Sequence, residues 1–121
     1  MTRNKQTRKL PSPDRVRQFE LVESMLDSLY REMKELSKKS PDGTLNSLKV
    51  KMINRVMADL KTVLGSEPSV GYLDLLEDEK LPSNSDVVLI LSQYDAAVTR
   101  FREKYTGDLD DPLGWTTSED S

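Results

Sequence analysis

The sequence predicts an all-α fold: an antiparallel three-helix bundle with one additional short helix and irregular charged tails. Apolar residues recur three and four positions apart over long stretches, which is the period of a helix with one buried face. Helix-start and helix-stop signals bound these stretches, and none of them keeps the two-residue alternation of a half-buried strand. At 121 residues, the chain can bury a core without disulfides or metals.

The first helix is expected over residues 13–38. Ser12 suits the N-cap, Pro13 the first helical position, and Asp14 the positive end of the helix dipole. The turn at residues 40–43 ends the helix. The apolar residues of this helix follow the alternating spacing of a coiled-coil seam: Phe19, Val22, Leu26, Leu29, Met33 and Leu36.

The second helix is expected over residues 44–64, with Thr44 or Asp42 as its cap and Gly65 just after its end. Its apolar residues cover roughly 200° of the helical wheel, which predicts neighbours on more than one side and a central position. The internal methionines lie on apolar helix faces and are expected to fill the core: Met25, Met33, Met52 and Met57.

The last helix is expected over residues 85–106, with Ser83 or Ser85 as its cap. Residues 66–82 are less regular, and a short helix is expected near residues 70–77. Four residues of this short helix are expected to cover one end of the core: Tyr72, Leu73, Leu75 and Leu76. Short connections then predict that helices adjacent in the sequence run antiparallel.

The expected organisation is a basic tail over residues 1–11, a helical domain over residues 12–107, and an acidic tail over residues 108–121. Charge is distributed unevenly, because residues 1–65 carry a net +6 and residues 66–121 a net −9. The two halves can attract each other, within one chain or between protomers, or the basic half can bind an external anion.

Residue types argue against an enzyme, a cofactor and a metal site. The chain has no cysteine and no histidine, which removes the thiolate nucleophile, the commonest general base and the commonest transition-metal ligand. The acidic clusters at residues 77–79 and 108–111 lack the spacing of a calcium loop. The longest apolar run, Val87 to Leu91, is far too short for a membrane span. A cytoplasmic, non-membrane protein is expected.

The leading hypothesis is a non-enzymatic helical protein–protein interaction module, an accessory or adaptor subunit that forms a homo-oligomer or binds a larger protein partner. The first helix, at about 39 Å, would extend beyond helices of about 30 Å and expose part of its apolar seam. The acidic tail adds spaced apolar residues, of which Trp115 either anchors a partner or folds back onto the helices. The candidate partner-binding residues are Phe19, Val22, Met33, Leu36, Leu109, Leu113 and Trp115.

The alternative hypothesis is a nucleic-acid-associated protein that neutralises phosphates with a basic arm and one face of the second helix. Arg15 and Arg17, at the start of the first helix, would add to this charge. No helix-turn-helix signature or interleaved aromatic residues support it. The candidate nucleic-acid-binding residues are Arg3, Lys5, Arg8, Lys9, Lys51, Arg55 and Lys61.

Overall fold

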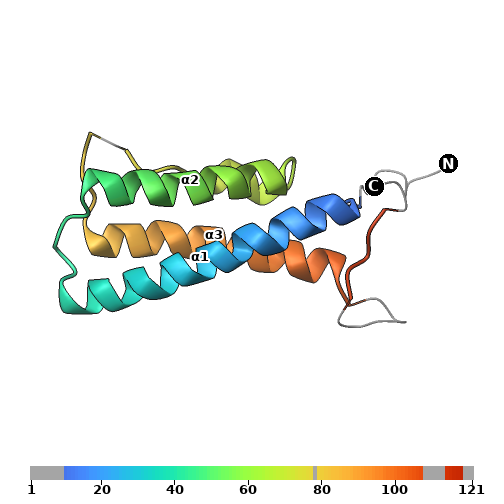
Figure 1. Ribbon diagram of the computed structural model, residues 1–121, viewed down its shortest axis with the longest axis horizontal. Helices are drawn as coiled ribbons and strands as arrows, with labels where there is room; N and C mark the ends of the chain where they lie inside the picture. The colour runs from blue at the N-terminus through green and yellow to red at the C-terminus, as the bar shows by residue number, and fades with distance from the viewer. Residues whose placement is uncertain (1–9, 78, 108–113, 119–121) are drawn as a thin grey trace.

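The computed structural model describes residues 10–77, 79–107 and 114–118, and over these residues it confirms the all-α bundle. Helices pack together without a strand in the described part of the chain, where the extended pairings are two isolated bridges. The elements, labelled in Figure 1, are α1 (Pro13–Lys39), α2 (Ser47–Leu64), the 3-10 turn η2 (Pro68–Tyr72) and α3 (Asn84–Tyr105).

Local capping signals fix the starts of α1 and α3 as expected. The Ser12 hydroxyl accepts a hydrogen bond from the backbone N–H of Arg15 at 3.1 Å, and Pro13 is the first helical residue. The Ser83 hydroxyl accepts one from the backbone N–H of Asp86 at 3.2 Å. In both helices the side-chain oxygen satisfies a backbone donor that the helix itself leaves unpaired.

The start of α2 differs from expectation, because neither Thr44 nor Asp42 caps it. Asn46 is the cap, and its side-chain oxygen accepts a hydrogen bond from the N–H of Lys49 at 2.9 Å. Thr44 instead pairs with Ser83 in an isolated bridge, and the N–H of Leu45 donates to the carbonyl of Pro82 at 2.9 Å. This tertiary pairing holds the backbone extended and delays the helix.

The direction of the helices departs from expectation at one place. α1 runs opposite to both α2 and α3, whereas α2 and α3 run parallel to each other (Figure 1). Residues 65–77 and 79–83, which we call the connector, lie between α2 and α3 in the sequence and return along the length of the bundle. The N–H of Asn84 donates to the carbonyl of Gly43 at 2.8 Å near the two helix starts, and Lys104 pairs with Glu67 at 3.1 Å near the two helix ends. The predicted antiparallel pairing therefore holds for α1 with α2 and is wrong for α2 with α3.

The core lies between the three helices and is centred on aromatic and aliphatic side chains with no exposed surface. Phe19 from α1 and Phe101 from α3 stack with ring centroids 4.6 Å apart. The methionine expectation is half correct: Met33 and Met57 are buried, but Met25 and Met52 are 48% and 55% exposed, because they lie at the edges of their apolar stripes. The largest fully buried side chains include Phe19, Leu26, Met57, Leu60, Leu91, Tyr94 and Phe101.

Beyond η2 the connector is extended rather than helical, and α2 and α3 hold its backbone. The Asn54 amide donates to the carbonyl of Leu76 and accepts from its N–H, both at 2.8 Å. Lys61 Nζ donates to the carbonyl of Leu73 at 2.9 Å, and the Tyr94 hydroxyl donates to the carbonyl of Asp74 at 2.8 Å. These bonds replace the ladder partners that an extended segment would otherwise lack.

The expectation that all four apolar residues of this segment cover the core is only half correct. Leu73 and Leu76 pack into the core as expected, but Tyr72 and Leu75 are 80% and 43% exposed. The two buried leucines lie three positions apart, so this segment does not alternate as a regular strand would. The buried positions are those whose backbone Lys61 and Asn54 bind.

Tyr94 should ionise later than an ordinary tyrosine, because burial, assisted by the nearby Asp74 carboxylate, raises its pKa to about 12 from 10.0. In this window the unfolded chain loses the phenolic proton before the folded chain does. The stability contributed by neutral Tyr94 is therefore complete below pH 10 and is lost as the pH rises toward 12, by about 2–3 kcal/mol. An ultraviolet titration of tyrosinate absorbance should show this late step, and Tyr94→Phe should remove it. Because burial also raises the pKa of Tyr105, the test is the amplitude of the step: a late absorbance change that is no smaller in Tyr94→Phe would contradict the assignment.

Candidate protein-interaction surface

The structure buries most of the α1 residues that the sequence nominated for partner binding. Phe19, Val22 and Met33 are 0%, 2% and 5% exposed, so the expectation that they lie on an accessible overhang is wrong. Leu36 is half-buried against the same core. α3 has the 22 residues expected for it, so its length does not explain this burial. Phe19 is covered by Phe101 near the end of α3 and by Trp115. Leu109 and Leu113 lie outside the described residues.

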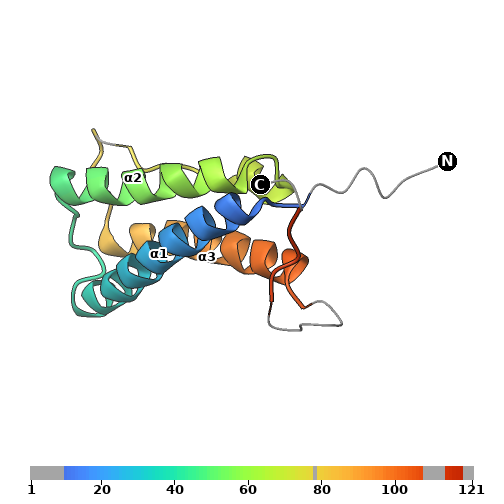
Figure 2. The ribbon, with the colours of Figure 1, turned by 45° about the vertical axis from the view of Figure 1, so that its right-hand side comes forward.

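Trp115 lies in the C-terminal segment (residues 114–118), which packs across the open end of the bundle beside the start of α1 (Figure 2). The N–H of Thr116 donates to the carbonyl of Tyr105 at 2.6 Å, and that of Ser118 to the carbonyl of Pro11 at 2.9 Å. The indole ring sits edge-on to Phe19, with centroids 5.4 Å apart. Of the two roles considered for Trp115, the structure shows the one in which it folds back onto its own helices.

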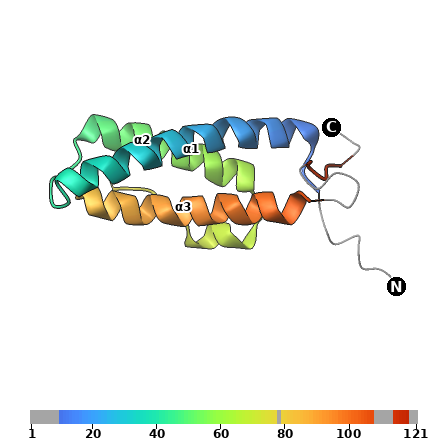
Figure 3. The same cartoon turned by 90° about the horizontal axis from the view of Figure 1, so that it is seen from below.

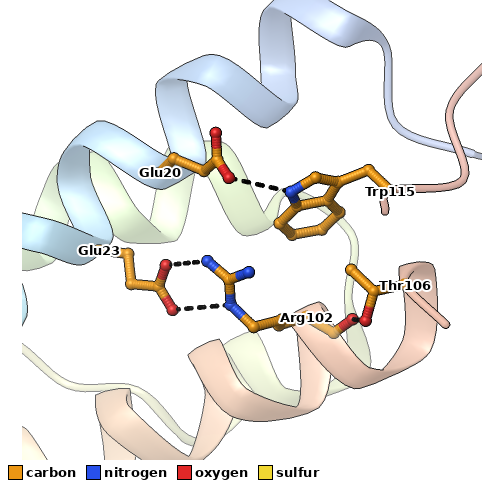
Figure 4. A network of polar contacts seen from close by, with 5 residues as sticks. All are labelled: Glu20, Glu23, Arg102, Thr106 and Trp115. Atoms are coloured by element: carbon orange, nitrogen blue, oxygen red, sulfur yellow. Dashed lines mark hydrogen bonds and ion pairs between the residues drawn. The ribbon is translucent and has the colours of Figure 1, made fainter. Parts of the chain in front are cut away.

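Charged side chains hold this segment in place (Figure 4). The Trp115 Nε1–H donates to the Glu20 carboxylate at 3.0 Å. The Arg102 guanidinium makes a two-pronged ion pair with Glu23 and lies 5.1 Å from the indole ring. The hydrogen bonds that Arg102 donates to the Glu23 carboxylate raise the pKa of Arg102 above its ordinary value. This network joins α1, α3 and the C-terminal segment, and its groups are already paired with one another.

Of the basic residues considered for nucleic-acid binding, some are bonded within the fold and others are exposed. Lys61 is taken up by the connector, as described above, and Arg15 donates from Nε and Nη2 to the carbonyls of Val63 and Leu64, at 2.7 and 2.9 Å. A cation at this place satisfies the unpaired carbonyls at the end of α2. The exposed members on α2 are Lys51 and Arg55. Arg3, Lys5, Arg8 and Lys9 lie outside the described residues.

A groove that the sequence analysis missed lies between the connector and α3. Figure 3 shows that η2, which lines part of it, lies on the side of α3 away from α1. The groove consists of successive hollows of about 690, 290 and 390 Å³, from the start of α3 toward its end. We call it the α3–connector groove. Most of the α3 residues that line it recur three or four apart and so form one stripe: Asp86, Leu89, Gln93, Ala96, Arg100 and Lys104. Ile90, Ala97, Phe101 and Glu103 lie beside this stripe.

The widest hollow of the groove gathers apolar side chains that remain open to solvent. Leu75 and Leu81 from the connector are 43% and 45% exposed, and Leu89 from α3 is 63% exposed. Three acidic residues and one lysine surround them: Asp74, Glu77, Asp86 and Lys80. The wide end is therefore an apolar floor with an acidic rim.

The narrow end of the groove is polar, and some of its polar side chains are hydrogen-bonded to one another. Glu67 accepts hydrogen bonds from Lys104 at 3.1 Å and from the Tyr105 hydroxyl at 2.8 Å. The hydrogen bond that Lys104 donates to Glu67 raises the pKa of Lys104, and burial raises the pKa of Tyr105. The charges of Lys104 and Glu67 compensate each other. The exposed leucines of the groove lie at its wide end, and the exposed Tyr72 lines the middle hollow.

A sequence signal for the groove was present in the apolar run Val87 to Leu91. The buried face of an amphipathic helix covers well under a full turn, so consecutive apolar residues cannot all point into the core. Val87 and Leu91 are fully buried, whereas Leu89 between them is the most exposed leucine of α3. In the sequence analysis this run served only to exclude a membrane span, and Leu89 was not identified as the residue that faces outward.

A second set of exposed apolar residues lies on α1 and α2. Leu21 and Met25 are one turn apart on α1, and Leu48 and Met52 are one turn apart on α2, with exposures between 48% and 66%. They belong to none of the hollows of the α3–connector groove. This set provides matched controls for substitutions in the groove.

Comparisons with family models, curated proteins and solved structures found no match. Among the described residues, no group of three or more acidic side chains is placed to hold a metal ion. Within the same part of the chain, no helix has the length and apolar character needed to cross a membrane. The interpretation of the site therefore depends on its own geometry and chemistry.

Proposed function

We propose that this chain is a non-enzymatic helical protein-interaction module, which binds a protein partner in the α3–connector groove. The observation that carries the proposal is the grouping of Leu75, Leu81 and Leu89, each 43% exposed or more, in one hollow of about 690 Å³. Singly exposed leucines are ordinary, but leucines gathered in a hollow and rimmed by charge mark interaction sites. Covering the exposed part of each leucine contributes roughly 1 kcal/mol to binding.

The fixed position of the connector supports the same proposal. Asn54, Lys61 and Tyr94 hold its backbone by hydrogen bonds of 2.8–2.9 Å, so one wall of the groove is tied to α2 and α3. A partner that enters a preformed groove loses less free energy to ordering than one that must organise a loop. A small subunit with such a face suits an accessory or adaptor role.

Residue chemistry favours binding over catalysis. The whole chain lacks histidine and cysteine, which are the commonest general base and the strongest nucleophile at neutral pH. Around the open leucines the groove offers three carboxylates and one lysine. These groups can orient a bound partner through charge.

A matched pair of substitutions tests the proposal. Leu89→Glu places a charge in the groove, and Leu48→Glu places the same charge on α2 at nearly equal exposure, 63% against 66%. Tagged full-length chains should capture partner proteins from the native host, with recovery by Leu89→Glu reduced at least about tenfold and recovery by Leu48→Glu unchanged. Circular dichroism should show that both variants are folded.

Two outcomes would contradict the proposal. One is that both variants lose the captured proteins equally, or that both retain them equally. Either result would show that the partner does not bind in the groove. The other is a wild-type chain that captures nothing above bait-free resin and is monomeric by light scattering.

A further inference from the structure

The wide end of the α3–connector groove carries unpaired negative charge. Lys80, the lysine on its rim, lies 3.8 Å from Glu77, and both side chains are strongly exposed. The carboxylates of Asp74 and Asp86 make no ion pair or side-chain hydrogen bond with any described residue. Two carboxylates without an ion-pair partner among the described residues therefore flank the open leucines, and Asp86 has the positive end of the α3 dipole beside it. A partner that covers the leucines also removes water from around both carboxylates.

That juxtaposition restricts what can bind. An acidic segment would bring like charges together in a site that is losing its water, and a purely apolar segment would leave the carboxylates desolvated without a partner. Lysine or arginine side chains beside the apolar contacts satisfy both requirements. Arginine and lysine also carry apolar stems that can cover leucine while their charged ends reach the rim.

We infer that the partner bound in the α3–connector groove presents a basic amphipathic segment: apolar side chains contact Leu75, Leu81 and Leu89, while Lys or Arg side chains pair with Asp74 and Asp86. This inference rests on the proposed function and adds the chemistry of the partner. The small residues Ala96 and Ala97, farther along the groove, allow the backbone of the segment to approach α3 closely. At the narrow end Glu67 is already paired with Lys104. The basic residues of the segment are therefore expected to bind at the wide end, where Asp74 and Asp86 lie.

Labelled peptides of about 18 residues, the length of the α3 stripe that lines the groove, supply the probe. One peptide has leucines at helical spacing with lysines elsewhere, a second has glutamate for each lysine, and a third has serine for each leucine. Fluorescence anisotropy with the full chain should show binding of the leucine–lysine peptide. The leucine–glutamate and serine–lysine peptides should bind at least about tenfold more weakly.

Variants that neutralise the rim carboxylates test whether the leucine–lysine peptide binds at the wide end of the groove. The double variant Asp74→Asn with Asp86→Asn should weaken binding of the leucine–lysine peptide at least about fivefold, since it removes both unpaired carboxylates. The control Asp27→Asn with Asp59→Asn makes the same change in net charge on the exposed surfaces of α1 and α2. It should change binding less than about twofold, because distant exposed charges are screened by salt.

Three results would overturn the inference and leave the proposed function standing. They are equal binding of the leucine–glutamate peptide, equal weakening by the two double variants, and a homodimer that Leu89→Glu converts to monomer. The last would show a second copy in the groove. If no peptide binds, the chain is monomeric, and Leu89→Glu and Leu48→Glu also behave alike in capture from the host, the inference and the proposed function both fail.

Discussion

Replacing Phe19 with alanine should lower the free energy of unfolding by about 3–5 kcal/mol. The ring is 0% exposed, stacks on Phe101 with centroids 4.6 Å apart, and meets the edge of Trp115 at 5.4 Å. The substitution removes an aromatic side chain that contacts α3 and the C-terminal segment, and it leaves a cavity that neighbouring helices cannot fill without moving. Urea unfolding followed by circular dichroism measures the loss.

Leu21→Ala is the matched control, because Leu21 lies two residues away on α1 and is 55% exposed. It should change stability by less than about 0.5 kcal/mol, as exposed positions usually do. Since a loss of several kcal/mol can unfold a marginally stable domain, Phe19→Leu provides a milder test, with an expected loss of about 1–2 kcal/mol. If Phe19→Ala changed the free energy of unfolding no more than Leu21→Ala does, Phe19 would be an accessible contact residue. Its assignment to the core would then be wrong.

Replacing Asn54 with leucine should cost about 2–3 kcal/mol and loosen the connector. The Asn54 amide makes both backbone hydrogen bonds of Leu76, each at 2.8 Å, and Leu76 is only 6% exposed. Leucine offers neither a donor nor an acceptor, so both backbone groups lose their partner in a place that water barely reaches. Chemical denaturation gives the total loss, and hydrogen exchange at the Leu76 amide reports the local one.

Asn54→Asp should fall between wild type and Asn54→Leu, because the carboxylate still accepts from the Leu76 N–H but cannot donate to its carbonyl. Lys51→Leu is the control on the same helix, and its exposed side chain makes its expected effect less than about 0.5 kcal/mol. Unchanged exchange at the Leu76 amide in Asn54→Leu would show that the buried leucines and the bonds of Lys61 and Tyr94 hold the connector without Asn54. The leucine–lysine peptide should also bind Asn54→Leu more weakly, since the variant releases a wall of the groove.

Much of the local structure could be predicted from the sequence because local interactions decide it. The start of α1 follows from Ser12 and Pro13, and the end of α2 follows from Gly65, whose φ of 61° suits a residue without a side chain. The start of α2 could not be predicted in this way. Asn46 replaces Thr44 as the cap because Leu45 is bonded to Pro82, a residue far away in the sequence.

The candidate site was harder to predict, since it depends on which polar side chains the fold itself uses. Lys61 and Arg15 look like free cations in the sequence, and both donate to backbone carbonyls of other elements. Phe19 looks like a seam residue that continues past its partners, and Trp115 covers it from the C-terminal segment. Leu89 could have been predicted to face outward, but its neighbours in the groove come from the connector.

The sequence by itself determined that this chain forms helices, where most of them begin and end, and which stripes can be buried, because caps, turns and periodicity act over a few residues. Only the tertiary structure decided that α2 and α3 run parallel, with the connector held between them by Asn54, Lys61 and Tyr94. Those hydrogen bonds join residues that are far apart in the chain, and no local pattern specifies them. The α3–connector groove exists because the connector is held there, so its place and chemistry became visible only in the folded protein.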